Sequence, residues 1–259
     1  MVLPKIAVDP AHEQACINVR ISSQSSLSLG TLDLESTSPV LSINISARCT
    51  SSTQPSRSMT LDVGRLVLDA PQSEDEGDNL AQGMLGMGGL VRVHPPSEQK
   101  PPKHVSLGFI RVHRARQEND DAEDLRDRPG ARFLTVPCLD SGEEITVTYN
   151  LTTSRIFEYA DGMTPSDLSA GERYRISLHP GYVGAKWWCW GGLDDELKDK
   201  KLHHTEAGSL GRIMREVSGK AELSEEVKQR DGWVVGEDRA QLRFAIQEEE
   251  RSCEVEIVP

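Results

Sequence analysis

The residues best suited to hold a ligand form an aromatic cluster in Lys186–Trp190. This segment contains three of the four tryptophans of the chain, Trp187, Trp188 and Trp190, and Tyr182 lies just before it. On a strand, Trp188 and Trp190 share one face while Trp187 points to the other. One face could pack on a core, and the other could present a flat platform to a sugar, a planar metabolite or a partner protein. Packing of all three rings inside the fold is the alternative, and tryptophan is usually packed in this way.

Arg155 offers a different chemistry, because its planar guanidinium matches the geometry of a carboxylate ligand. It lies in Ser154–Phe157, between two predicted strands. Together with Tyr182 and the tryptophans it could line a small-molecule site. An ion pair with one of the many surface acids is the alternative interpretation.

Residue types for metal or nucleophilic chemistry do not form a motif. His203 and His204 would point apart on a strand, and no second group of ligand-type residues has metal-binding spacing. The glycine-rich stretch 83–89 matches neither phosphate-loop pattern, and no GxSxG nucleophile elbow occurs. We therefore predict no metal and no cofactor, and we favour a non-enzymatic protein. A catalytic site assembled from separate loops stays open as an alternative.

Two strands on either side of a long connection must position these residues. Residues 145–151 alternate between apolar and polar side chains, as a half-buried strand does, and residues 173–178 repeat the pattern. Asp161, Gly162 and Pro165 lie between them and favour turns. We therefore expect a strand, a long crossover and a second strand.

The entry to the second strand, Gly171–Tyr174, resembles the tyrosine corner of immunoglobulin-like sandwiches. In that corner a tyrosine near the start of a strand hydrogen-bonds to backbone a few residues upstream. The resemblance implies structural roles for Gly171 and Tyr174. The chain departs from antibody domains, because Ile176 follows Tyr174 by two where a cysteine would stand, and no Trp precedes Trp187. A disulfide packed on a tryptophan is therefore not expected.

The second half of the chain also resembles uncharacterised proteins of filamentous fungi. Segments similar to Ser154–Phe157, Gly171–Tyr174 and Pro180–Trp190 recur in that group. Its motifs are not tied to an activity, so the resemblance implies a fold and no function.

The pattern as a whole predicts an all-β, immunoglobulin-like antiparallel β-sandwich with long polar insertions and one or two short helices. The helices are expected at 194–201 and 223–230, from charge order and polarity. The last two strands, near 242–246 and 253–257, are expected to form a hairpin because both alternate and a short acidic stretch joins them.

One domain is expected over residues 16–259, after an irregular arm at 1–15. The first half lacks its own copy of the corner motif, which favours one sandwich over two. The insertions are expected at 71–89, 115–131 and 191–240.

Charge and cysteine content limit the partners and the compartment. The formal net charge of −12 repels phosphate backbones and anionic membranes, so neither nucleic acid nor a membrane is expected as a partner. The five cysteines are odd in number and widely spaced, which indicates free thiols in a reducing compartment. No secretory signal is apparent, so we expect a cytoplasmic or nuclear protein. The glycosylation patterns at Asn44 and Asn150 are then chance matches.

Three functions fit these observations. The first is an intracellular interaction protein that binds another protein through an edge strand or the Trp-containing loop. The second is a small-molecule site, or an auxiliary enzyme of fungal metabolism, near the Trp cluster. The third is a carbohydrate-binding module, which requires exposed and coplanar tryptophan rings.

Overall fold

The computed structural model describes residues 10–69, 85–93, 104–108, 124–203 and 232–259. In these ranges the chain is built mainly of strands, and the one α-helix among them is the short α2 (Thr153–Phe157). The all-β prediction is therefore confirmed for the described residues. None of their helices has the length and apolar character needed to cross a membrane.

The first sheet, called the β3 sheet below, contains four strands in the order β13-β1-β3-β8. Their bounds are Leu242–Ala245 for β13, Ala15–Ser23 for β1, Leu41–Ser52 for β3 and Ile145–Leu151 for β8. β1 and β8 pair antiparallel with the long central β3, whereas β13 runs parallel to β1. The arm expected at 1–15 therefore ends just before Ala15, where β1 begins.

The second sheet, called the β9 sheet, contains five strands in the order β2-β14-β9-β5-β6. Their bounds are Ser26–Ser28 for β2, Ser252–Val258 for β14, Arg173–Ser177 for β9, Leu90–Arg92 for β5 and His104–Val105 for β6. β14 and β5 pair antiparallel with β9, and β6 pairs antiparallel with β5. β2 is parallel to β14.

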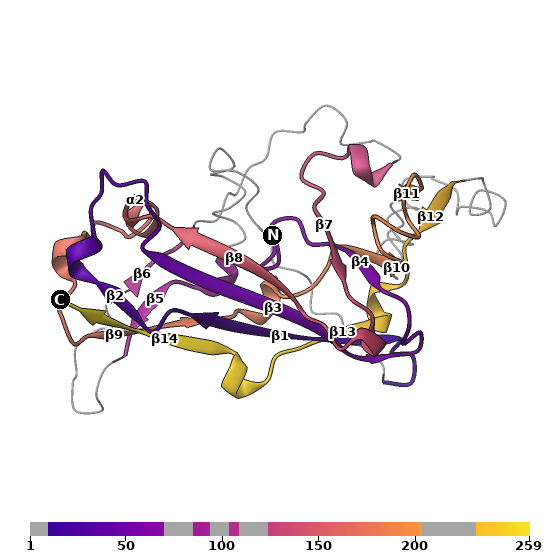
Figure 1. The fold of residues 1–259 in the computed structure, drawn as a ribbon, viewed down its shortest axis with the longest axis horizontal. Coiled ribbons are helices and arrows are strands. Elements are labelled where there is room, and N and C mark those ends of the chain that lie inside the picture. The colour runs from indigo at the N-terminus through magenta and orange to yellow at the C-terminus, as the bar shows by residue number, and fades with distance from the viewer. Residues whose placement is uncertain (1–9, 70–84, 94–103, 109–123, 204–231) are drawn as a thin grey trace, which may run out of the picture.

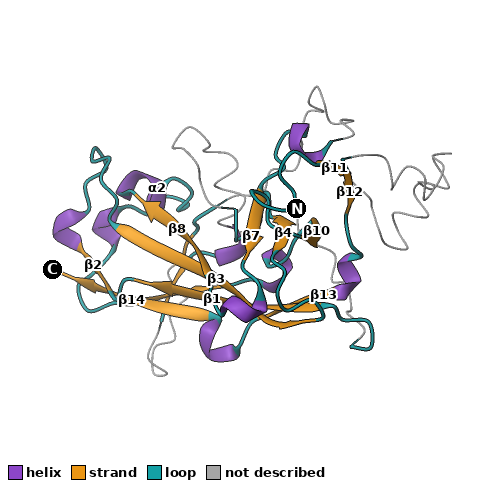
Figure 2. Ribbon diagram, turned by 45° about the vertical axis from the view of Figure 1, so that its right-hand side comes forward, coloured by secondary structure: helices purple, strands orange, loops and turns teal. Residues whose placement is uncertain are grey.

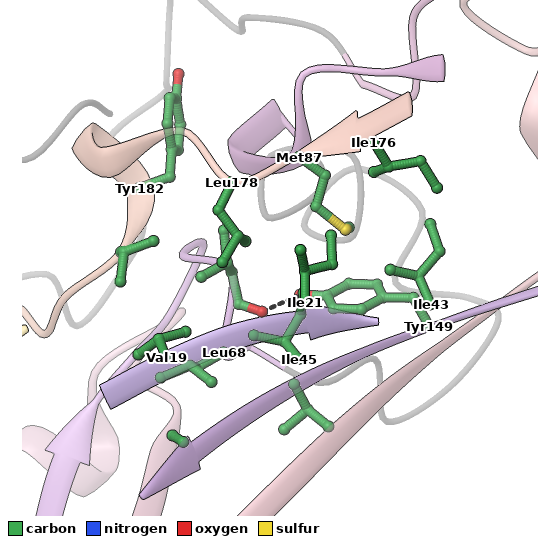
Figure 3. Close-up of a cluster of buried hydrophobic side chains, with 14 of the residues drawn as sticks. Val19, Ile21, Ile43, Ile45, Leu68, Met87, Tyr149, Ile176, Leu178 and Tyr182 are labelled. Carbon is green, nitrogen blue, oxygen red and sulfur yellow. Dashed lines mark hydrogen bonds between the residues drawn. The ribbon is translucent and has the colours of Figure 1, made fainter. Parts of the chain in front are cut away.

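The inner faces of these two sheets share one contiguous hydrophobic core. Alternation decides which side chains enter it: β8 buries Val147, Tyr149 and Leu151, and β9 buries Tyr174 and Ile176. Figure 3 shows side chains of β1 and β3 facing those of β9 and the residues beside it. Both strands predicted within 142–178 are confirmed, and the crossover between them carries the chain from one sheet to the other.

A third sheet, the β4 sheet, has the order β10-β4-β7 and lies beside the β13 end of the β3 sheet in both views (Figures 1 and 2). Its strands are β10 (Trp187–Trp190), β4 (Met59–Asp62) and β7 (Phe133–Val136). All four residues of β4 are buried, so both faces of this sheet are covered. One face joins the main core. The other faces a second core formed by Leu125, Trp187, Cys189, Leu197 and Leu202.

The predicted insertion at 191–240 contains regular structure, because β11 (Lys201–His203) and β12 (Trp233–Val235) form a parallel pair. In the insertion at 115–131 the described part holds a 3-10 helix, η4. The part of 71–89 beyond residue 84 holds another, η3. Among the described residues the 3-10 helices are η1 (Leu29–Thr31), η3 (Leu85–Met87), η4 (Leu125–Asp127), η5 (Leu139–Ser141), η6 (Pro165–Asp167), η7 (Pro180–Tyr182), η8 (Arg239–Gln241) and η9 (Glu248–Glu250).

Three expectations about local structure need correction. Residues 193–199 form consecutive turns, with Asp199 at φ +60°, in place of the helix expected at 194–201. The expected hairpin is absent, because β13 pairs with β1 while β14 pairs with β9 in the other sheet. The sheets are also not wholly antiparallel, since β13 and β2 join their neighbours in parallel. The helix expected at 223–230 lies outside the described residues.

Candidate functional site

β10 alternates as predicted, and its two sides enter two different cores. Trp188 and Trp190 face the main core, where their ring centroids lie 5.4 Å apart at an interplanar angle of 74°. Trp187 and Cys189 face the second core, where the ring of Trp187 meets Phe133 edge-on at 6.2 Å. These geometries are the favourable edge-to-face kind.

The platform proposed for these tryptophans is not formed, because all three rings are buried. The exposed fractions of Trp187, Trp188 and Trp190 are 1%, 0% and 4%. Their indole nitrogens donate, in that order, to the backbone oxygen of His203 at 3.1 Å, the backbone oxygen of Asp238 at 3.0 Å and Oε1 of Gln14 at 3.2 Å. The segment after β12 covers the strand, since the backbone N–H of Glu237 donates to the Trp188 carbonyl at 2.8 Å. The sugar-binding and small-molecule hypotheses both required exposed tryptophan rings at this strand, and the rings are buried.

Tyr182 is also a packing residue. It is 6% exposed and belongs to the main core. Its carbonyl accepts from Val67 N–H at 3.1 Å, and its ring meets His179 edge-on at 5.7 Å. Figure 3 shows its hydroxyl directed away from the packed side chains.

Arg155 lies in α2. Thr152 is the N-cap of this helix, and its hydroxyl accepts a hydrogen bond from the backbone N–H of Arg155. Its guanidinium forms an ion pair with Glu158 and lies 4.9 Å from the centre of the Tyr159 ring. Pairing with an acid, the alternative interpretation of this residue, is therefore observed. α2 lies toward the left and β10 toward the right in both views, well apart from one another, so Arg155 and the tryptophans do not share a site (Figures 1 and 2).

The backbone hydrogen bond expected of Tyr174 in a tyrosine corner is replaced by one to a side chain. Its hydroxyl donates to Oε2 of Glu172 at 2.9 Å. That carboxylate is 8% exposed, forms an ion pair with Arg92 at 3.2 Å and accepts from Ser169 N–H at 3.1 Å. Gly171 stands at φ +84° and donates its N–H to the Ile257 carbonyl at 2.8 Å. A buried carboxylate two residues away competes successfully for the hydroxyl, because charge-assisted hydrogen bonds are the stronger ones.

A buried thiol and two buried phenols are held in their protonated forms. Burial raises the pKa of the Cys189 thiol to about 12, so the nucleophilic thiolate is not populated near neutral pH. The pKa of Tyr174 is raised mainly by burial and, to a smaller extent, by its hydrogen bond to Glu172. Burial also raises the pKa of Tyr149, whose hydroxyl donates to the carbonyls of Val67 and Asp69 at 2.9 and 3.0 Å. No group of three or more metal-type ligands occurs among the described residues.

Among the described residues, the feature best suited to binding is the edge of β8 that faces away from β3, which the sequence pattern did not locate. β8 ends the order of the β3 sheet and, among the described strands, pairs with β3 alone. At seven residues it is longer than the other end strands, which have two to four. Its register with β3 runs from Leu41↔Leu151 to Ala47↔Ile145 without a shift. An unbroken row of main-chain N–H and C=O groups of this length is a template for another strand.

The outward side chains of β8 form a polar ladder with β3. Three cross-strand hydrogen bonds join Ser42 to Asn150 at 2.7 Å, Asn44 to Thr148 at 2.8 Å and Ser46 to Thr146 at 2.8 Å. At the end of the ladder Arg20 forms an ion pair with Glu144 at 2.5 Å. The outward residues of β8 are uncharged. Their side chains are held by hydrogen bonds to the neighbouring strand β3. The sequence signal for this edge is that Ile145–Leu151 contains neither Lys nor Pro.

Comparison of the chain with protein-family models, with curated proteins and with solved structures gave no match.

Proposed function

We propose that this chain is an immunoglobulin-like β-sandwich that acts as an interaction module inside the cell and binds an extended polypeptide along the edge of β8. The observation that carries the proposal is the seven-residue edge strand with its unshifted register. Addition of a strand to such an edge is a recurring mode of peptide recognition, in which main-chain hydrogen bonds provide the affinity.

Strand order supports the immunoglobulin-like assignment. In that fold strands A, B, E and D form one sheet, and C, F and G form the other. β1, β3 and β8 occupy the order A-B-E, and β5, β9 and β14 occupy C-F-G. The crossover from β8 to β9 corresponds to the E–F connection, where Tyr174 stands near the start of strand F. The β4 sheet and the β11–β12 pair are then additions to one sandwich.

The same assignment identifies the position that a partner strand would take. Strand D lies next to strand E in an immunoglobulin sheet. No described strand occupies that position beside β8. A partner strand would take the place of D and continue the sheet.

The thiols support a location inside the cell. All five cysteines fall within the described residues and none forms a disulfide. Free thiols persist in reducing compartments, whereas secreted domains of this kind usually carry disulfides.

Selection of phage-displayed random peptides against the full chain tests the proposal. Selected peptides should slow amide hydrogen exchange in β8 and leave β10 unchanged. The matched control is each peptide N-methylated at alternate residues, which removes main-chain donors and keeps the side chains. Loss of binding on N-methylation supports strand addition. Protection confined to other elements, or equal binding of the methylated peptides, contradicts it.

A further inference from the structure

We infer that the polypeptide that fits the β8 edge is β8 of a second copy of this chain, in an antiparallel pair about a two-fold axis through Thr148. This inference rests on the proposed function of the edge. It would join the β3 sheets of two chains into one continuous sheet.

The two-fold register follows from the strand itself. In an antiparallel pair, directly opposite residues point to the same side of the sheet. Keeping both cores on one side requires that inward residues oppose inward residues, because a slip of one residue would reverse the faces. An axis at Thr148 meets this condition and aligns all seven residues, with Ile145 opposite Leu151 of the other copy.

The opposed side chains are compatible at every position. On the outward face Thr148 meets Thr148, and Thr146 meets Asn150, so hydroxyls and amides face one another. On the inward side Val147 meets Tyr149, a β-branched residue against an aromatic one, which is a favourable cross-strand pair. Each opposed pair is therefore one that stabilises sheets. The pairs away from the axis are each made twice because the interface is isologous, whereas Thr148 meets its own copy once, on the axis.

No like charges meet at the ends of the paired segment. The first charged residue, Glu144, would lie opposite Thr152 of the other copy, and its carboxylate is already paired with Arg20 at 2.5 Å. Repulsion comes from the chains as a whole, since each carries a formal net charge of −12. Salt screens that long-range term and leaves the uncharged contact intact, so added salt should strengthen the dimer.

β8 also lacks the devices that keep other edge strands apart. Natural edges are shortened, bulged or marked with Lys or Pro. The other end strands of the described sheets are short, with two to four residues. β8 has seven residues and none of these devices in its own sequence.

Sedimentation velocity of the full chain, over a range of concentrations, tests the inference through a pair of charge variants. Thr148→Lys and Thr148→Asp each place like charges opposite one another at the axis, which should weaken self-association by roughly tenfold or more. An equimolar mixture of the two variants should recover dimers, because Lys then meets Asp. The control is Ser22→Lys, which places the same charge on the same face but two strands, or about 10 Å, from the edge.

The outcomes separate this inference from the proposed function. A wild-type dimer that Thr148→Lys dissociates, that the mixture restores and that Ser22→Lys preserves supports the β8 pair. A wild-type monomer at all concentrations overturns the second copy as partner, while peptide protection of β8 would still stand as evidence for strand addition. A dimer equally insensitive to both Lys variants places the interface elsewhere and overturns the inference. Circular dichroism melts confirm that each variant is folded.

Discussion

Trp187 and Trp188 are neighbours in the chain, yet their rings lie in two different hydrophobic cores. Trp188 packs with Trp190 against the main core, and Trp187 packs with Phe133 on the other side of the β4 sheet. β10 therefore joins the main core to the segment that contains β11 and β12. The sequence of β10, which is apolar on both faces, also fits a ligand platform. In the fold this strand is buried between the two hydrophobic cores.

Replacing either ring tests this division. Trp188→Ala should lower the free energy of unfolding by about 3–5 kcal/mol, since it opens a cavity in the core shared by the main sheets. Trp187→Ala should instead speed amide exchange chiefly in β11 and β12, because its cavity lies in the second core. Urea unfolding and hydrogen exchange measure the two effects. Val91→Ala, at a side chain 39% exposed, is the control and should change stability by no more than about 0.5 kcal/mol.

Gly236 provides a separate test of the Trp187 position. A Cβ at Gly236 would lie 2.1 Å from the Trp187 indole nitrogen, so the ring must move in Gly236→Ala. We expect a loss of about 1–3 kcal/mol in stability and a red shift of tryptophan fluorescence as the ring meets water. Gly30→Ala, whose Cβ would meet nothing closer than Ser28 Oγ at 3.6 Å, should be tolerated. Unchanged fluorescence in Gly236→Ala would contradict the packing described.

The hydrogen bond from Tyr174 to Glu172 predicts a difference between two conservative changes. Tyr174→Phe removes a donor from the buried Glu172 carboxylate, which should cost about 1–3 kcal/mol. Tyr182→Phe removes a hydroxyl that Figure 3 shows pointing away from the core, so it should cost less than about 0.5 kcal/mol. Equal losses from the two changes in chemical denaturation would count against a stabilising role for the hydrogen bond from Tyr174 to Glu172.

Cys189 predicts how stability falls in alkaline solution. Its pKa rises from the ordinary thiol value of 9.0 to about 12 in the fold, because burial disfavours the thiolate. Between these values the unfolded chain has lost a proton that the folded chain keeps. Stability therefore falls as pH rises above about 9, by up to about 1.4 kcal/mol per pH unit from this group. Between pH 8 and pH 10.5 the free energy of unfolding should fall less steeply in Cys189→Ala than in the wild-type chain. The difference in slope should correspond to a large part of one bound proton. An identical slope in the two proteins would refute the raised pKa of Cys189.

Local patterns predicted much of the fold but only part of the candidate site. The alternation in 145–151 and 173–178 correctly predicted both strands and their buried faces. The faces of Trp187 and Trp188 were also correct, whereas the exposure of their rings was not. Exposure depends on the segment near Glu237, which lies far along the chain and covers β10. The residues of the β8 edge were recognised as a strand, but its position at the end of a sheet has no signature in a period of two.

The sequence by itself determined which residues form strands and which side chains turn inward, because a period of two is set by the pleat of each strand alone. Only the tertiary structure decided which strands pair, as β13 and β14 illustrate by joining opposite sheets. It also decided that the three tryptophans of β10 are covered and that β8 has one partner among the described strands. Strand pairing and side-chain burial depend on segments that come together from distant parts of the chain. The alternation of apolar and polar residues within one strand is compatible with many choices of neighbouring strand.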